Sequence, residues 1–168
     1  MLSFVFPTAA HREDVHAFYA AFEAAGETCI GYGGWQDFDR WLAGMQNRKT
    51  ATDLPEGYVR ENFYLVYDGD EMIGVFSLKF ELTPYLFDFG GHIGYAVTPA
   101  RRNRGLATAT LAQGLTLARS LGFSKLLLVC DEDNPASERV IVKNGGVFED
   151  TRYDPDEEVR VHRYWITL

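Results

Sequence analysis

Residues 94–108 read Gly-Tyr-Ala-Val-Thr-Pro-Ala-Arg-Arg-Asn-Arg-Gly-Leu-Ala-Thr, and the rest of the chain can be placed around them. The short apolar run Ile93 to Val97 is typical of a strand, and Pro99 ends it. Beyond a basic loop, apolar residues recur at helical spacing from Leu111 to Leu121, and Gly122 follows as a C-terminal stop. The stretch therefore predicts a strand, a loop and the start of a helix.

The loop in this stretch predicts an anion-binding site. Residues Arg102 to Ala107 lie where the backbone N–H groups of a helix start have no partner, and the helix dipole favours negative charge there. Gly105 has no side chain to obstruct a phosphate. Arg101, Arg102 and Arg104 add positive charge, although the whole chain has a formal net charge of -8. A basic cluster on an acidic protein favours a bound polyanion over a solvated loop.

Two other kinds of phosphate-binding loop are excluded by the sequence. The chain has no Gly-Lys-Ser/Thr, which would hold a nucleoside triphosphate with magnesium. It also has no G-x-G-x-x-G, the pattern of a dinucleotide-binding loop. The polyanion is therefore expected to be of another class.

Length and composition indicate an ordinary globular protein. The chain has 168 residues, of which 46% are hydrophobic and 24% are charged, so we expect a single domain over residues 1–168. No apolar run approaches the roughly 20 residues of a membrane span, and the N-terminus has no basic segment followed by a hydrophobic one. We therefore expect a cytoplasmic protein without a membrane partner.

The numbers of cysteines, histidines and charges argue against disulfide-rich, metal-binding and nucleic-acid-binding proteins. Cys29 and Cys130 are too few and too far apart for a disulfide framework or a zinc site, and the four histidines form no H-x-x-x-H pair. We therefore expect no metal. The sequence pI of about 4.9 argues against nucleic acid as a partner, because phosphate backbones are held by clustered Lys and Arg.

Hydrophobic spacing and turn chemistry predict the remaining elements. The segment Glu81 to Gly91 receives no assignment. In chain order we expect a strand over 2–6, helices over 9–25 and from Phe38 to Met45, a hairpin of strands over 63–67 and 72–80 around Asp68-Gly69-Asp70, the strand and helix described above, a strand over 125–130, a helix from Asn134-Pro135 to Gly145, and strands over 147–153 and 159–167.

The loop Arg102-Asn103-Arg104-Gly105-Leu106-Ala107 resembles the pyrophosphate loop of the GNAT acetyltransferase superfamily, [Gln/Arg]-x-x-Gly-x-[Gly/Ala]. The element order is also similar to the GNAT fold, and His92 through Gly146 resembles a bacterial branch known mostly as predicted acetyltransferases. The resemblance implies a mixed α/β fold whose central mixed sheet of about six to seven strands is flanked by about four helices. It implies acetyl-CoA as co-substrate, with no metal.

The resemblance also implies which residues hold the cofactor. Asn134 matches a family asparagine that contacts the cofactor near its pantetheine, but an Asn before Pro135 is also an expected helix N-cap without any ligand. Ser137 matches the same region and could likewise only satisfy the first turn of the helix. Tyr95, Ala96 and Val97 match the strand whose backbone groups hydrogen-bond the pantetheine arm in the family. The pyrophosphate cradle is matched by Arg102, Asn103, Arg104, Gly105, Leu106, Ala107 and Thr108.

The usual proton-transfer residues of the family are absent. Ile141 stands where the family often has a tyrosine as general acid, and Val129 stands where it often has a glutamate as general base. His92 and Ser137 are the remaining candidates for catalytic side chains. Cys130, Asp131 and Glu132 at the end of the expected neighbouring strand could also help, although Cys130 is typical of an inert core thiol and the two carboxylates are typical of a solvated turn. The resemblance thus implies direct acetyl transfer to an amine of a small molecule or peptide, and the alternative is a catalytically silent acyl-CoA-binding sensor or interaction module.

The acceptor region implied by the resemblance is partly aromatic and acidic. It includes Tyr32, Trp35 and Tyr85, together with the acidic link Asp154 to Glu158, and this combination would suit an amine. The sequence leaves the acceptor unnamed and the oligomeric state open, with a homodimer as one option.

Overall fold

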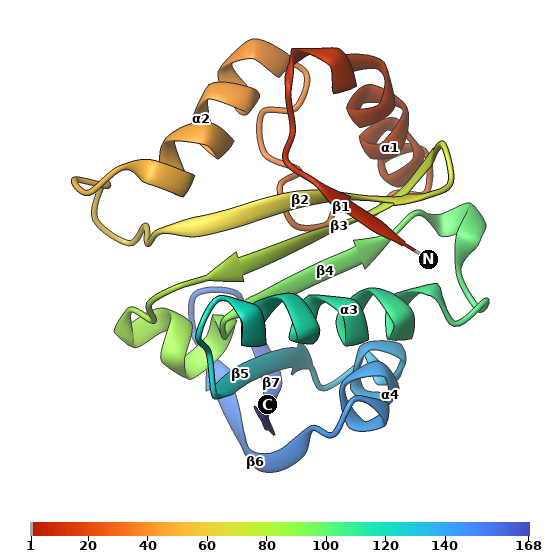
Figure 1. Cartoon of the computed structure of the whole chain (residues 1–168). Helices are drawn as coiled ribbons and strands as arrows, with labels where there is room; N and C mark the ends of the chain where they lie inside the picture. The colour runs from red at the N-terminus through yellow and green to blue at the C-terminus, as the bar shows by residue number, and fades with distance from the viewer. Residues whose placement is uncertain (1) are drawn as a thin grey trace.

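Every strand and helix that the sequence predicts is present in the computed structural model, which describes residues 2–168 (Figure 1). The strands are β1 (Ser3–Val5), β2 (Glu61–Asp68), β3 (Glu71–Lys79), β4 (Ile93–Val97), β5 (Lys125–Asp131), β6 (Val147–Asp154) and β7 (Val159–Thr167). The helices are α1 (Arg12–Ala24), α2 (Phe38–Thr50), α3 (Leu106–Ser120) and α4 (Pro135–Lys143), with the short turns η1 (Ala9–His11), η2 (Leu86–Gly90) and η3 (Pro99–Arg101).

Residues 2–168 form seven strands, in agreement with the expected six to seven, and these are divided between two antiparallel sheets where one mixed sheet was expected. The first sheet has the order β1-β2-β3-β4, and the second has the order β5-β7-β6. The predicted hairpin joins β2 to β3, and Gly69 at its turn has a φ of +63°, which glycine adopts without strain.

β4 and β5 meet at a junction between the two sheets. The N–H of His92 donates to the carbonyl of Leu127 at 2.8 Å, and the N–H of Leu127 donates to Nδ1 of His92 at 2.9 Å. Gly91 allows this approach, because a Cβ there would lie 2.7 Å from the Leu127 carbonyl oxygen. After this junction the two strands belong to separate sheets, so an edge of each is left unpaired.

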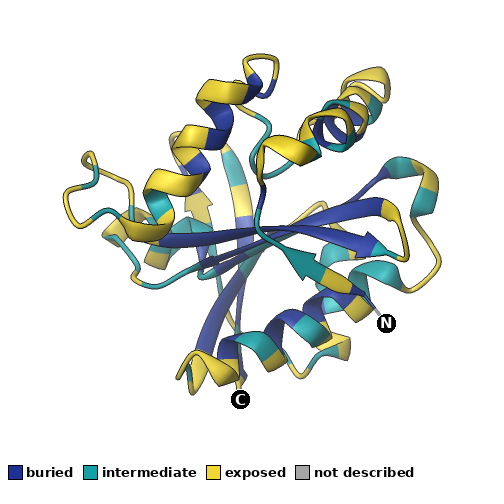
Figure 2. Cartoon of the chain, turned by 45° about the horizontal axis from the view of Figure 1, so that its top comes forward, coloured by how far each residue is buried: buried dark blue, intermediate teal, exposed yellow. Residues whose placement is uncertain are grey.

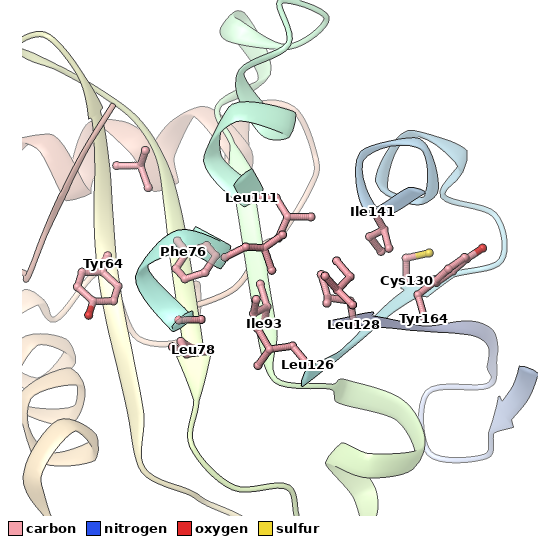
Figure 3. Close-up of a cluster of buried hydrophobic side chains, with 14 of the residues drawn as sticks. Tyr64, Phe76, Leu78, Ile93, Leu111, Leu126, Leu128, Cys130, Ile141 and Tyr164 are labelled. Atoms are coloured by element: carbon pink, nitrogen blue, oxygen red, sulfur yellow. The ribbon is translucent and has the colours of Figure 1, made fainter. Parts of the chain in front are cut away.

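Helices cover both faces of the first sheet, and apolar side chains fill the space between them. α1 and α2 pack on one face of the first sheet, over a cluster that is rich in aromatic residues. α3 and α4 pack on the other side, where side chains from both sheets gather around Phe76, Leu128 and Ile141 (Figure 3). β2 and β3 are almost wholly buried, β6 is mostly exposed or half-buried, and the outer faces of the helices are exposed (Figure 2).

A glycine in α3 sets how closely this helix lies on the first sheet. A Cβ at Gly114 would lie 2.2 Å from Cε2 of Phe76 on β3, so no larger residue fits at this position without a shift. Gly114 and Phe76 are both buried. The position of α3, including its N-terminus, therefore depends on this contact.

The segment without a sequence assignment, residues 81–91, contains η2 and packs against the second sheet. The fully buried Arg163 of β7 donates from Nε to the Phe87 carbonyl at 3.1 Å and forms ion pairs with Glu149 and Asp150. This arginine therefore anchors η2. Among residues 2–168, no helix is long and apolar enough to cross a membrane.

Candidate cofactor cleft and active site

A cavity of about 800 Å³ lies where β4 and β5 separate. Its walls come from the η3–α3 loop, the first turn of α3, α4, the end of β5 and the connection between α1 and α2. Eleven of the twelve residues predicted to contact the cofactor line it, and Arg104 is the exception: Tyr95, Ala96, Val97, Arg102, Asn103, Gly105, Leu106, Ala107, Thr108, Asn134 and Ser137.

The loop before α3 has the backbone geometry of an anion cradle. Gly105 is the N-cap of α3 with a φ of +76°, and Asn103 also has a left-handed φ of +60°. Among residues 2–168, the amides of Asn103, Arg104 and Gly105 find no backbone acceptor. A Cβ at Gly105 would meet no atom within 4 Å, so the space over the cradle is open. These donors and the helix dipole together favour a bound anion.

The arginines of this loop are less available than the sequence predicts. Arg101 is directed to the β2–β3 hairpin, where it forms ion pairs with Asp68 at 2.9 Å and with Glu71. Arg102 binds Glu27 through two hydrogen bonds of 3.0 and 2.6 Å, and these bonds lower the pKa of the Glu27 carboxyl. The cradle therefore relies mainly on backbone donors, and Glu27 competes with any anion for Arg102.

Asn134 caps α4 and also lines the cavity. Its Oδ1 accepts from the N–H of Ser137 at 3.1 Å, which is the helix-cap role that the sequence alone predicts. The side-chain NH₂ of Asn134 has no acceptor among residues 2–168. Capping uses Oδ1 and leaves the NH₂ group available to a ligand, so the two interpretations of this residue are compatible.

Two cations on α4 were missed by the sequence analysis. Arg139 and Lys143 are four residues apart, so they lie on one face of the helix, and both line the cavity. Neither forms an ion pair within residues 2–168. The spacing is visible in the sequence, but it does not say which face of α4 meets the cavity.

A pair of hydroxyl groups bridges β4 and α4 inside the cavity. Tyr95 Oη and Ser137 Oγ lie 3.0 Å apart. Burial raises the pKa of Tyr95 to about 12, so its phenol stays protonated near neutral pH. Ile141 is fully buried in the core, so the usual tyrosine position of α4 is not available for chemistry. The sequence analysis assigns a role only to the backbone of Tyr95.

The end of β5 brings a thiol and a carboxylate to the cavity. Burial raises the pKa of Cys130 to about 12, so its sulfur is a neutral thiol near pH 7. Asp131 lines the cavity as well, and partial desolvation together with the charge of Asp133 raises the pKa of this solvent-exposed carboxyl. A raised pKa makes this carboxylate a better proton acceptor than an ordinary aspartate.

His92, the other candidate for catalysis, does not line this cavity. Its ring packs edge-on against Phe123 and Trp165, and its Nδ1 accepts from Leu127 at the sheet junction. Burial lowers the pKa of the imidazole, and the backbone hydrogen bond opposes this shift. These contacts give His92 a structural position at the end of β4 and β5 where the two strands meet, which we call the closed end.

The residues expected near the acceptor also lie outside the cavity. Trp35 is buried in the aromatic core under α1 and α2. Tyr85 donates to the buried Asp154 at 2.7 Å, so both groups are engaged with each other. Tyr32 packs against the same aromatic core. These expected residues are thus not part of the cavity, whereas Cys130 and Asp131 at the end of β5 line it.

Comparisons with known proteins concern the family and the fold of the chain. A family model described as acetyltransferase (GNAT) domain matches residues 2–147. A search of curated proteins found no match.

Several solved structures are similar to this chain at low sequence identity. The acetyltransferase from Salmonella typhimurium that modifies the N-terminal serine of 50S ribosomal subunit protein L7/L12 has a TM-score of 0.75 at 19% identity, over 99% of this chain and 95% of that chain. Mycobacterium smegmatis RimJ in complex with CoA-disulfide has a TM-score of 0.76 at 16% identity, over 99% and 81% of the two chains. A chimera of spermidine N-acetyltransferase SpeG from Vibrio cholerae and hSSAT has a TM-score of 0.67 at 17% identity, over 99% and 94%. At such identities the likeness concerns the fold.

Proposed function

The chain belongs to the GNAT acetyltransferase family, and from this premise we propose that it transfers the acetyl group of acetyl-CoA directly to an amine held between the diverging ends of β4 and β5. It is an acetyltransferase of this family, and acetyl-CoA is its co-substrate. The observation that carries the proposal is one cavity that joins the anion cradle of α3, the free edge of β4 and the polar end of β5. We take residues 1–168 as one domain acting in the cytoplasm.

The residues of the cavity fit coenzyme A along its length. The amides from Asn103 to Thr108 would hold the pyrophosphate, and the open space over Gly105 accommodates it. The free edge of β4 from Tyr95 to Val97 would bond the pantetheine arm as a neighbouring strand does, because only one edge of β4 is paired. The side-chain NH₂ of Asn134 would donate to the same arm.

Acetyl-CoA supplies an activated thioester, so the protein must orient the carbonyl, receive a proton from the amine and return one to the sulfur. Alternate N–H groups on the free edge of β4 would polarise the carbonyl. The paired hydroxyls of Tyr95 and Ser137 would donate to the departing sulfur. Asp131 would accept the proton of the amine, directly or through a water molecule.

The acceptor is proposed to be a small-molecule or peptide amine that carries a positive charge in solution. Asp131, Glu132 and Asp133 form an acidic turn at the point where the acceptor would approach, and the chain is acidic overall. Related folds act on a protein N-terminus in one case and on spermidine in another. Both acceptors are amines, which is the class that an acidic mouth would attract.

Isothermal titration with acetyl-CoA tests the cofactor part of the proposal, with ADP and NADH as controls. Saturable binding of acetyl-CoA alone is the expected result. Release of CoA thiol with a panel of polyamines, amino acids and peptides then tests turnover. Binding of acetyl-CoA without release of CoA thiol for any amine would favour the alternative of a silent acyl-CoA sensor. That alternative is suggested by Val129 and Ile141, which replace the usual glutamate and tyrosine of the family.

The proton-transfer roles are tested in the same assay with single substitutions. Asp131→Asn should lower kcat about 100-fold and remove the acidic limb of the pH–rate profile, because the proton acceptor is lost. Tyr95→Phe should lower kcat about tenfold and leave the Kd for acetyl-CoA nearly unchanged. Asp133→Asn should move the acidic limb to lower pH, since the Asp133 charge helps to raise the pKa of Asp131. An unchanged profile in Asp131→Asn would refute its role.

A further inference from the structure

Two cationic side chains of α4, Arg139 and Lys143, line the cavity but are not part of the pyrophosphate cradle. Both line the cavity beside the cradle, and both are exposed to solvent. The cradle already has backbone donors and the dipole of α3 for a pyrophosphate. The α4 cations therefore add a second positive wall to the same end of the cavity.

Hydrogen bonding fixes where this second wall lies. Asn144, which follows α4, donates from Nδ2 to the Thr108 carbonyl in the first turn of α3 at 3.3 Å and to the Val140 carbonyl at 2.9 Å. The C-terminal end of α4 is thus tied to the N-terminal end of α3. Since Asn134 lies at the other end of α4, the cavity wall passes along the helix from Asn134 through Arg139 to Lys143 beside the cradle.

The α4 cations also differ from the loop arginines in their partners. Arg101 is held by Asp68 and Glu71, and Arg102 is held by Glu27. Within residues 2–168, no carboxylate forms an ion pair with Arg139 or Lys143. Exposed cations that are free of intramolecular partners can pair with a ligand without first breaking another contact.

We propose that Arg139 and Lys143 bind the 3′-phosphate of coenzyme A and so make this enzyme selective for CoA over dephospho-CoA. This inference rests on the proposed function, because it needs the cofactor in the cavity. A phosphate monoester carries a charge of about -1.5 to -2 near pH 7, so it calls for two cations, whereas each phosphoryl of the pyrophosphate carries about one. The α4 pair supplies these two cations one helical turn apart, next to the cradle.

Titration calorimetry with two ligands tests the proposal on the full chain. The wild type, the double variant Arg139→Gln with Lys143→Gln, and a matched control are each titrated with CoA and with dephospho-CoA, which lacks only the 3′-phosphate. The control is Arg40→Gln with Arg119→Gln, which removes two exposed cations that lie outside the cavity. Glutamine keeps the length and helix propensity of these side chains, so α4 should remain folded.

The wild type and the control should bind CoA roughly tenfold more tightly than dephospho-CoA, and the double variant should bind both ligands with similar affinity. The CoA preference of the wild type should also weaken as salt is raised. Equal loss for both ligands would place the cations on the pyrophosphate and overturn the proposal, as would no loss at all. A wild type that binds neither ligand would instead refute the proposed function itself, and the inference with it.

Discussion

β4 and β5 are neighbours at one end and separated at the other, and the two ends are built from different kinds of contact. At the closed end, His92 exchanges two hydrogen bonds with Leu127, and its ring packs against Phe123 and Trp165. At the open end, the loop before α3 and the end of β5 present unpaired amides, hydroxyls and charges to a cavity. One pair of strands therefore serves as both a support and a binding site.

The difference shows that a functional side chain cannot be recognised by residue type alone. His92 has a chemistry suited to catalysis, but it is used to join two sheets. Tyr95 was expected to contribute only its backbone, but its hydroxyl meets Ser137 in the cavity. What separates the two residues is their place relative to the point where the strands diverge.

The largest expected effect comes from blocking the open end. Gly105→Glu should weaken acetyl-CoA binding roughly 100-fold or more, because a carboxylate would occupy the cradle and repel the pyrophosphate. Gly122→Glu at the other end of α3 is a matched control, since Gly122 also has a positive φ, of +93°, and open space around it. Both changes carry a similar backbone cost of about 1–2 kcal/mol. Calorimetry checks the result, and equal loss in the control would point to a folding defect instead.

Breaking the closed end should reduce stability more than binding. His92→Ala should lower the free energy of unfolding by about 1–3 kcal/mol, because the N–H of the fully buried Leu127 loses its acceptor. His92→Asn offers another acceptor and should recover part of the loss. Urea unfolding measures both. If His92→Ala removed turnover while stability stayed unchanged, the structural assignment would be wrong and the catalytic one would return.

The lowered pKa of His92 leads us to expect that the stability of the protein depends on pH. Burial lowers the pKa of His92 below its ordinary value of 6.5, so the unfolded chain binds the proton more readily than the folded one. The stabilisation is complete above about pH 6.5 and is lost as the pH falls toward the lower folded value. Wild type should therefore lose more stability than His92→Asn between pH 7 and pH 5, and identical curves would argue against the shift.

The smallest effect concerns a contact that joins the two sides of the open end. Glu27→Gln should strengthen acetyl-CoA binding by up to about fivefold, because Arg102 no longer has a carboxylate to leave before it meets the pyrophosphate. Glu23→Gln on α1 removes a similar charge outside the cavity and should change little. Weaker binding in Glu27→Gln would mean that Glu27 positions Arg102 for the ligand and does not compete with it.

The sequence predicted the elements because each depends on local chemistry. Asp68-Gly69-Asp70 makes a hairpin turn, and Asn134 with Pro135 begins a helix, whatever surrounds them. The division into two sheets could not be predicted in this way. The apolar run Ile93 to Val97 has the same pattern whether or not a strand pairs with both of its edges.

The cradle of the candidate site could be predicted for the same reason, since it lies in one continuous loop. The contacts that tune it could not, because they join residues far apart in the chain. Glu27 reaches Arg102 across 75 positions, and Tyr95 reaches Ser137 across 42. Arg139 and Lys143 show the intermediate case, in which the helical spacing is local but the choice of face is set by packing.

Gly114 shows how far the control of binding extends from the ligand. It touches Phe76 of β3, it lies outside the cavity, and its lack of a side chain lets α3 rest on the first sheet. A methyl group there would push the helix outward and move the amides at its N-terminus with it. In a selection for acetyl-CoA binding, Gly114 would therefore tolerate as little change as Gly105. Gly105 acts by leaving room for the cofactor, and Gly114 acts by aligning the helix that receives it.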